Sequence, residues 1–319
     1  MFLIEYFSSL NPASLARALP GNCAQGLIWG VMALGVYITY RLLDFADLTV
    51  DGSLATGGAV AVMLIRGGMH PAPALIFSFL AGMLAGMATG LLHTALGIPG
   101  ILASILTQIS LYSINLGIMG KSNQAVNVDN YPLVVSLRYV TAGGTTRILF
   151  FGGLILGIAL LILVLYWFFG TELGGAVRTT GCNENMARAQ GINTNFIKVL
   201  ALMLSNGLVG LSGGLYAQYQ GSADVNMGRG AIVIGLAAVI IGEVLFGKLA
   251  SKSKYSFALT MGAVIIGAII YYIAIALVLW LKMPQDYMKL FSAVVVAIFL
   301  SIPYLKDKYG RKRKAVAKS

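Results

Sequence analysis

The sequence predicts an all-α fold, a polytopic bundle of transmembrane helices with about nine spans, within a range of roughly eight to ten. Of the 319 residues, 58% are hydrophobic and only 10% are charged, whereas soluble globular chains carry about 25% charged residues. The mean hydropathy is +0.84. Apolar stretches recur along the chain, and each must be helical because lipid offers no partner for free backbone groups. These observations exclude a water-soluble fold.

The positions of the apolar stretches predict the individual spans. We expect them at residues 26–40, 53–65, 72–96, 100–119, 148–169, 196–219, 231–246, 257–281 and 287–304. Together they form one transmembrane domain over residues 21–304. A cytoplasmic tail at residues 305–319 places most of the 22 Lys and Arg on the inner side. The positive-inside rule therefore predicts a basic cytoplasmic tail and an external N-terminus.

The start of the chain does not fit a cleaved signal peptide. Glu5 interrupts the short apolar stretch, and no basic region precedes it. We expect residues 1–20 to be an interfacial segment on the outer surface of the membrane. In the same topology, the longest external loop covers residues 121–147.

A polar segment at residues 171–198 separates two long apolar spans. It is expected on the cytoplasmic side. Within it, the stretch from Asn183 to Gly191 predicts a short helix, with Asn183 as N-cap and Gly191 as a left-handed stop. Arg188 lies among small residues in this helix. A two-turn helix on a membrane face suits docking to a partner.

Three carboxylates, Asp44, Asp47 and Asp51, precede the second span, which is too short to cross a bilayer alone. We expect a broken helix, because glycines such as Gly52 and Gly57 permit unwinding and close approach. Free backbone at membrane depth is tolerated only beside protein or a water-filled cavity, so the acidic residues indicate a pathway. The alternative is a cytoplasmic loop in which Asp51 serves as the N-cap of the next helix.

Residues 36–52 and 215–230 share a weak internal similarity. Five predicted spans separate the two copies, and an odd separation reverses the direction of crossing. This arrangement is typical of inverted-topology repeats whose interrupted helices meet near the bilayer midplane. Chance similarity between two tightly packed, glycine-rich helices is the alternative.

Four stretches resemble one known family. DLTVDGSLATGGA at 47–59 and AVRTTGCNENMARAQGIN at 176–193 resemble permease subunits of ATP-binding-cassette importers of the branched-chain amino-acid and ribose type. In that family they correspond to the second helix and the cytoplasmic coupling segment. SNGLVGLSGGLYAQ at 205–218 and AAVIIGE at 237–243 are similar to the glycine-rich helices that follow. FADLTVDGS further resembles a subgroup often assigned aromatic or other amino acids.

The resemblance implies a permease in the bacterial inner membrane that forms a dimer, for which we expect two copies of this chain, with a homologous second permease as the alternative. Its partners would be two ATPase subunits on the cytoplasmic face, an external substrate-binding protein and membrane lipid. The nearest string to a Walker A motif, NLGIMGKS at 115–122, lacks the first glycine. ATP and Mg would therefore bind to the partner ATPase, with no cofactor in this chain. The placement of the net charge of +11 favours the membrane over nucleic acid as its partner.

Three groups of residues are the predicted sites. The ATPase-coupling residues are Arg178, Asn183, Glu184, Met186, Ala187, Arg188, Ala189 and Gly191. The residues of the translocation pathway are Asp47, Asp51, Gly52, Ser53, Thr56 and Gly57. The residues that dock the binding protein are Lys121, Arg138, Arg147 and Arg229. We expect no metal site and no enzyme activity, since no Ser-His-Asp order, HExxH or CxxC is present.

The alternative function is an ion-coupled secondary transporter. In that case Asp44, Asp47, Asp51 and Asp224 would bind the driving ion themselves.

Overall fold

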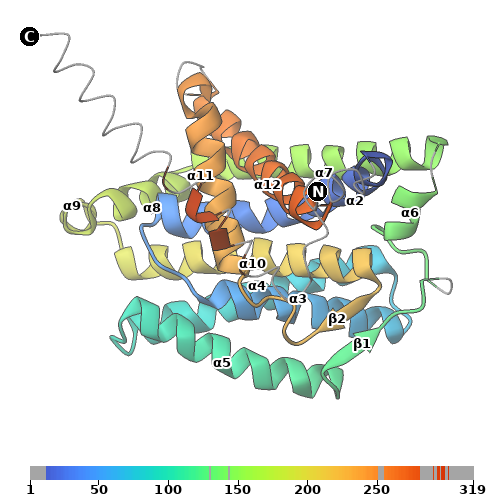
Figure 1. The fold of residues 1–319 in the computed structure, drawn as a ribbon. Helices are drawn as coiled ribbons and strands as arrows, with labels where there is room; N and C mark the ends of the chain where they lie inside the picture. The colour runs from blue at the N-terminus through green and yellow to red at the C-terminus, as the bar shows by residue number, and fades with distance from the viewer. Residues whose placement is uncertain are drawn as a thin grey trace, which may run out of the picture.

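The chain forms a helical bundle with one small pair of strands at one end (Figure 1). The computed structural model describes residues 12–128, 131–142, 144–250 and 255–280, with a few positions between 290 and 301. The helices of the first half are α2 (Pro12–Tyr37), the π-helical turn η1 (Ile38–Leu42), α3 (Thr49–Arg66), α4 (Pro71–Thr94) and α5 (Gly100–Met119). They are followed by α6 (Leu137–Thr141), α7 (Gly144–Gly170), α8 (Glu172–Cys182), α9 (Glu184–Ala189), α10 (Thr194–Gln220), α11 (Ala231–Ala250) and α12 (Ser256–Trp280). Strands β1 (Asn123–Ala125) and β2 (Ser222–Asp224) pair in antiparallel register.

Six of these helices are long and apolar enough to cross a membrane. They are Ala13–Leu42, Pro71–Thr94, Gly100–Met119, Gly144–Gly170, Thr194–Gln220 and Ser256–Trp280, and the shorter Ala231–Gly247 is also apolar. The structure therefore supports a polytopic helical protein. The count of nine spans and the orientation of the termini stay predictions, because residues 1–11, most of the ninth span and the tail 305–319 lie outside the described residues.

The start of the chain is described from Pro12 onward. Residues 12–20, which we expected within a separate interfacial segment, form the first turns of α2. Their position relative to the membrane surface stays a prediction.

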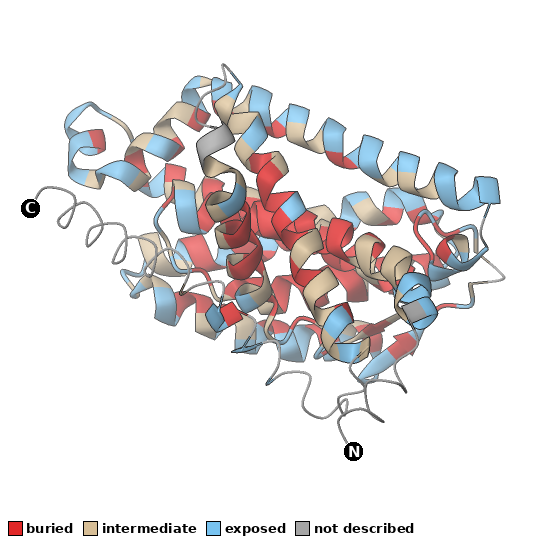
Figure 2. Ribbon diagram, turned by 45° about the horizontal axis from the view of Figure 1, so that its top comes forward, coloured by how far each residue is buried: buried red, intermediate tan, exposed pale blue. Residues whose placement is uncertain are grey.

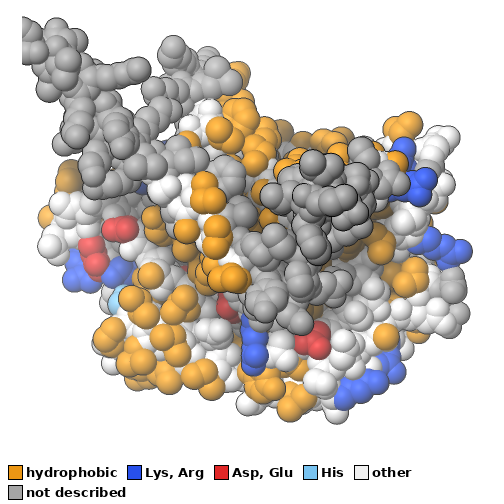
Figure 3. Space-filling model, viewed as in Figure 1, with side chains coloured by type: hydrophobic (Ala, Val, Ile, Leu, Met, Phe, Trp, Pro, Cys, Tyr) orange, Lys and Arg blue, Asp and Glu red, His pale blue; other side chains and the backbone are white. Residues whose placement is uncertain are grey.

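The core lies where α2, α3, α10 and α12 meet, and Figure 2 shows buried residues gathered there. α10 packs along α4 and α3, while α2 packs along α12 and α11. The outer helices expose large apolar side chains, for example Leu149 on α7, which is 78% exposed. Hydrophobic side chains cover much of the face drawn in Figure 3, and Lys and Arg gather mainly at its two ends. Such a surface suits a lipid environment.

The predicted break within the second helix is wrong. α3 is continuous from Thr49 to Arg66, and the irregular backbone lies before it, at residues 43–48. Gly57 faces α10, where an added Cβ would overlap the carbonyl of Gly210. Its lack of a side chain serves close helix packing rather than unwinding.

Candidate translocation site and coupling helix

The irregular stretch before α3 holds a buried polar network. Asp47 is 2% exposed, and its Oδ1 accepts a hydrogen bond from the backbone amide of Thr49, 2.9 Å away, at the start of α3. Asn206 of α10 donates from Nδ2 to Asp47 Oδ2 at 2.6 Å and accepts at Oδ1 from the Ser53 hydroxyl at 2.7 Å. The network therefore ties the first turns of α3 to the middle of α10.

Asp51 plays a similar part for a second helix. Its carboxylate accepts hydrogen bonds from the backbone amides of Gly230 and Ile232, at 2.9 and 3.0 Å. These amides lie at the start of α11, where a carboxylate is favoured by unpaired N–H groups and by the helix dipole. The two similar segments noted in the sequence thus contact each other, and each supplies the start of a helix.

The depth of this junction follows from α10. Asn206 lies 12 residues after Thr194, which at 1.5 Å per residue is roughly 18 Å along a helix of about 40 Å. If α10 crosses the membrane, α3 and α11 begin inside it. Backbone that is not helical at this depth must be surrounded by protein or line a cavity.

A polar cavity of about 320 Å³ lies at this junction, between α3, α5 and the segment before α11. Its lining residues are Asp51, Gly52, Gln108, Ile109, Tyr112, Ser113, Asn115, Val225, Asn226 and Arg229. Seven of these ten are not hydrophobic, and six carry a side-chain amide, hydroxyl or guanidinium donor that can face a solute. The arrangement can hold a small polar molecule.

The predicted pathway residues divide between the cavity and the helix contacts around it. Asp51 and Gly52 line the cavity, while Asp47 and Ser53 belong to the buried network. The Thr56 hydroxyl donates to its own helix, at the carbonyl of Gly52, 2.9 Å away.

The α5 side of the cavity was missed at the sequence level. Gln108, Tyr112 and Asn115 recur every three or four residues on this helix, whose other residues are apolar or carry small hydroxyl groups, and this spacing places them on one face. This spacing is visible in the sequence and could have indicated the polar wall.

The four aspartates of the ion-coupled alternative do not converge. Asp44 is exposed at a left-handed backbone position, φ 55°. Asp47 and Asp51 bond to different helix starts, and Asp224 Oδ1 accepts from the backbone amide of Asn226 at 2.7 Å. Within the described residues, no group of three or more His, Cys, Asp or Glu side chains could hold a metal ion.

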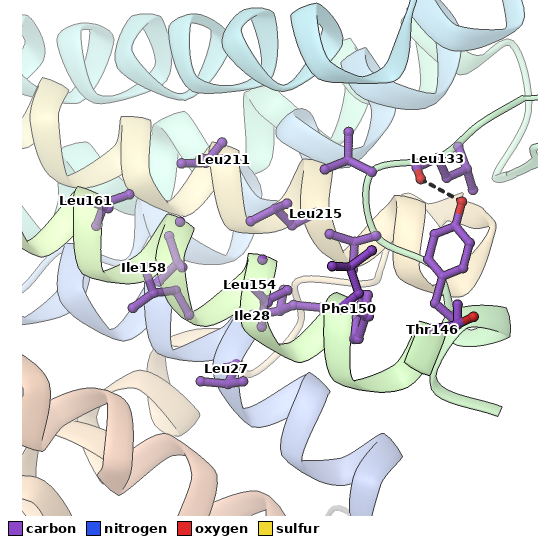
Figure 4. A pocket seen from close by; sticks show the side chains of 17 residues that line it. Leu27, Ile28, Leu133, Thr146, Phe150, Leu154, Ile158, Leu161, Leu211 and Leu215 are labelled. Carbon is purple, nitrogen blue, oxygen red and sulfur yellow. Dashed lines mark hydrogen bonds between the residues drawn. The ribbon is translucent and has the colours of Figure 1, made fainter. Parts of the chain in front are cut away.

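A larger cavity of about 550 Å³ lies between α2, α7 and α10 (Figure 4). Its wall is apolar apart from Tyr139 and Thr146 near one end, where the Tyr139 hydroxyl donates to the carbonyl of Leu133 at 3.1 Å. Leu154, Ile158 and Leu161 of α7 point toward it. This wall offers little to a charged solute, which would lose its hydration without new partners.

The predicted short helix in the polar segment is present as α9. Asn183 caps it by accepting at Oδ1 from the Met186 amide at 3.1 Å, and Gly191 follows with a left-handed φ of 83°. In Figure 1, α8 and α9 lie at one end of the bundle, and α6, β1 and β2 lie at the opposite end. The predicted coupling segment and the predicted external loop are therefore at opposite ends.

Glu184 is the centre of the contacts that hold α9. Its Oε1 accepts from Arg188 Nη2 at 2.6 Å, from Lys198 Nζ at 2.7 Å and from the Thr194 hydroxyl at 3.3 Å. Arg188 Nε also donates to Thr194 Oγ1 at 2.8 Å. The hydrogen bond from Lys198 is the main cause that lowers the pKa of Glu184. This network joins α9 to the first turns of α10.

Two of the predicted coupling residues, the buried Ala187 and the exposed Arg178, contact this chain itself. Ala187 is fully buried, so the expectation that it fits a groove of a partner is wrong, because it packs within the segment itself. Arg178 donates to the carbonyl of Phe169 at 2.9 Å, and its guanidinium lies 5.9 Å from the ring centre of Phe257. The guanidinium thus supplies a hydrogen-bond donor to a carbonyl in the last turn of α7, where helix carbonyls lack partners within the helix, and it also contacts an aromatic ring. Met186, 54% exposed, and Ala189 form the outward face of α9.

Three of the four basic residues assigned to docking line three different cavities, and the fourth, Arg138, lies in α6. Arg229 lines the polar cavity, while Arg147 lies beside α6 in a different cavity, together with Arg17. Lys121 lies near β1, beside Arg66. Arg229 is therefore better placed to meet a solute than a docked protein.

Comparison with known proteins identifies the family. Residues 22–300 match the family described as branched-chain amino acid transport system / permease component. A tyrosine transport system permease protein of Clostridioides difficile (strain R20291) is 39% identical over 284 residues, covering 87% of this chain and 88% of the relative. The autoinducer 2 import system permease protein LsrC of Yersinia pseudotuberculosis serotype O:1b (strain IP 31758) is 31% identical over 226 residues, covering 70% of this chain and 60% of the relative.

One solved structure, PsaBC from Streptococcus pneumoniae in complex with Fab, is similar with a TM-score of 0.36 at 18% identity, covering 83% of this chain and 95% of that one. The family match and the relative at 39% identity agree with a bundle that has six helices able to cross a membrane. The chain belongs to the branched-chain amino acid transport permease family and is a multi-pass transport protein of the inner membrane, not an enzyme.

Proposed function

We propose that this permease forms the substrate pathway of an ATP-binding-cassette importer for an amino acid, with an aromatic amino acid as the first candidate. The observation that carries this proposal is the polar cavity between α3, α5 and the start of α11. It lies where α3 and α11 begin, which is at membrane depth if α10 crosses the bilayer, and transporters commonly place their substrate sites at that depth. The 39% identity to a tyrosine transport permease supports the class of substrate.

ATP-driven motion would enter through α9. The helix is short, projects at one end of the bundle and is braced against α10 by Glu184, Arg188 and Lys198. A braced helix can transmit a displacement as a rigid body to α10, and α10 carries Asn206 of the buried network. Two ATPase subunits that bind ATP and Mg would press on the exposed Met186 and Ala189.

The remaining parts of the proposal concern topology and assembly. We expect about nine spans, an external N-terminus and a cytoplasmic C-terminus, which place α9 inside the cell. A binding protein would deliver the substrate at the opposite end, near β1, β2 and α6. Two permease chains would pair around the pathway, with two copies of this chain as the first candidate and a homologous second permease as the alternative.

Proteoliposomes separate this function from ion-coupled transport. With the ATPase, the binding protein and ATP supplied, labelled tyrosine should accumulate only when ATP is hydrolysed. Uptake by the permease alone, driven by a sodium or proton gradient, would support the ion-coupled alternative and remove the proposed function.

Gly191→Val tests the role of α9 in the same vesicles. Valine is strained at a φ of 83° by about 1–2 kcal/mol, so the variant should disturb the end of α9 and lower the uptake per ATP hydrolysed. Gly97→Val is the matched control, because Gly97 also has a left-handed φ, of 67°, and has open space around it. Equal coupling in both variants would remove the role of α9.

A further inference from the structure

We propose that the polar cavity recognises the α-carboxylate and α-ammonium groups of its amino acid, through Arg229 and Asn115. This inference rests on the proposed function and adds to it the chemistry by which the permease itself selects a solute. Both residues line the cavity, and they come from opposite sides of it, Asn115 from α5 and Arg229 from the turn before α11.

Asn115 is the most informative residue of the cavity wall. It is 1% exposed, yet neither its Nδ2 nor its Oδ1 has a hydrogen-bond partner within the described part of the chain. Buried amides in native proteins are nearly always hydrogen-bonded. An amide with both ends unpaired on a cavity wall therefore indicates that an occupant completes its hydrogen bonds, with one donor and one acceptor.

Arg229 supplies the charge. The residue is exposed, and its guanidinium has no hydrogen-bond or ion-pair partner among the residues that the structure describes. Asp51 is the only acidic residue on the described wall, and its two oxygens already accept from the amides of Gly230 and Ile232. The guanidinium is therefore available for an anion, and its planar fork matches a carboxylate with two parallel hydrogen bonds.

The rest of the wall fits a zwitterion better than a simple anion. The side-chain oxygen of Asn115, Oδ1, can accept a hydrogen bond from an ammonium group, while its side-chain nitrogen, Nδ2, donates to a carboxylate oxygen. Tyr112 adds an aromatic face beside them, and it is 44% exposed in the chain alone. The site would thus bind an amino acid by its backbone groups and leave the side chain to contact Tyr112 and Ile109.

Protection of a cavity cysteine tests the proposal without relying on transport. Gln108→Cys, in a chain with Cys23 and Cys182 replaced by alanine, is treated in isolated membranes with a charged, membrane-impermeant methanethiosulfonate reagent. L-tyrosine, or an equimolar mixture of the twenty amino acids, should slow the modification, whereas tyramine, which lacks the carboxylate, should not. Arg229→Gln and Asn115→Leu should each raise the protecting concentration by roughly tenfold to a hundredfold.

Several controls keep the outcomes distinct. Arg17→Gln removes a guanidinium that lines a different cavity. In this variant the amino acids should protect the introduced cysteine at the same concentration as in the parent. Arg229→Lys, which keeps the charge without the planar guanidinium, should restore part of the protection. An unchanged rate of modification without ligand shows that the variants fold.

Equal protection by tyramine, no protection by any amino acid, or protection that survives Arg229→Gln would overturn the proposal. ATP-driven uptake of the amino acid is measured separately and decides the proposed function. Uptake without protection of the cysteine refutes only this recognition site. Protection of the cysteine without uptake refutes only the importer function.

Discussion

Asn206→Ala should destabilise the folded bundle by about 2–4 kcal/mol, because its side-chain amide bonds to two buried side chains outside α10. The Nδ2 donates to the Asp47 carboxylate at 2.6 Å, and the Oδ1 accepts from the Ser53 hydroxyl at 2.7 Å. A hydrogen bond to a charged group is worth about 1.5–3 kcal/mol and a neutral one about 0.5–1.5 kcal/mol. The carboxylate would keep its bond from the Thr49 amide but lose its link to α10.

The measurement is the free energy of unfolding in mixed micelles, by titration with a denaturing detergent, in a double-mutant cycle with Asp47→Ala. We expect a coupling energy of about 1.5–3 kcal/mol, above the roughly 0.6 kcal/mol that interhelical hydrogen bonds in membranes average. Asn22→Ala is the control, since among the described residues the side chain of Asn22 bonds to the carbonyl of Ala18 in its own helix, and the substitution should cost under about 0.5 kcal/mol. Additive effects of the two substitutions, within about 0.5 kcal/mol, would refute the network.

Three further outcomes follow from the packing and charges. Arg188→Glu should place a second carboxylate beside Glu184 and uncouple ATP hydrolysis from uptake while membrane insertion, checked by fractionation, stays normal; parental uptake per ATP would contradict this role. Because the folded pKa of Glu184 is lowered mainly by its hydrogen bond from Lys198, this contact stabilises α9 fully above the unfolded pKa of about 4.3 and is lost as pH falls through the folded value. The protection of α9 amides against exchange, relative to the intrinsic rate at each pH, should therefore fall below about pH 4, and Glu184→Gln should remove that dependence; the same fall in protection in the variant would count against it. Gly57→Val should reduce folded protein severely, because its side chain would enter the backbone of α10, while Gly117→Ala, with open space around it, should express at the parental level in a fluorescence-detected gel filtration assay.

The sequence predicted the helical class, most of the spans and the local structure of α9, because these depend on apolar length and on caps close in the chain. Asn183 and Gly191 illustrate this, since their partners lie within a few residues. The continuity of α3 could not be predicted, because glycine permits both unwinding and close packing. Only Gly210, far along the chain but adjacent in space, decides between them.

The candidate site was predicted only in part, for a related reason. Asp47 and Asp51 were identified from their charge within an apolar context, yet their partners Asn206 and Gly230 come from the other half of the chain. Asn115 has no charge and lies in an ordinary apolar helix. Its importance depends on a cavity that forms only when the turn before α11 packs against α5.

The central claim is that force from a separate ATPase enters this permease through α9. The most direct measurement uses Met186→Cys, in a chain without Cys23 and Cys182, cross-linked by a short thiol reagent within the reconstituted importer during ATP turnover. We expect a covalent adduct between α9 and the ATPase, with uptake of tyrosine falling in proportion to the adduct formed. An importer that transports normally and yields no adduct, or one that transports at the full rate when cross-linked, would contradict it.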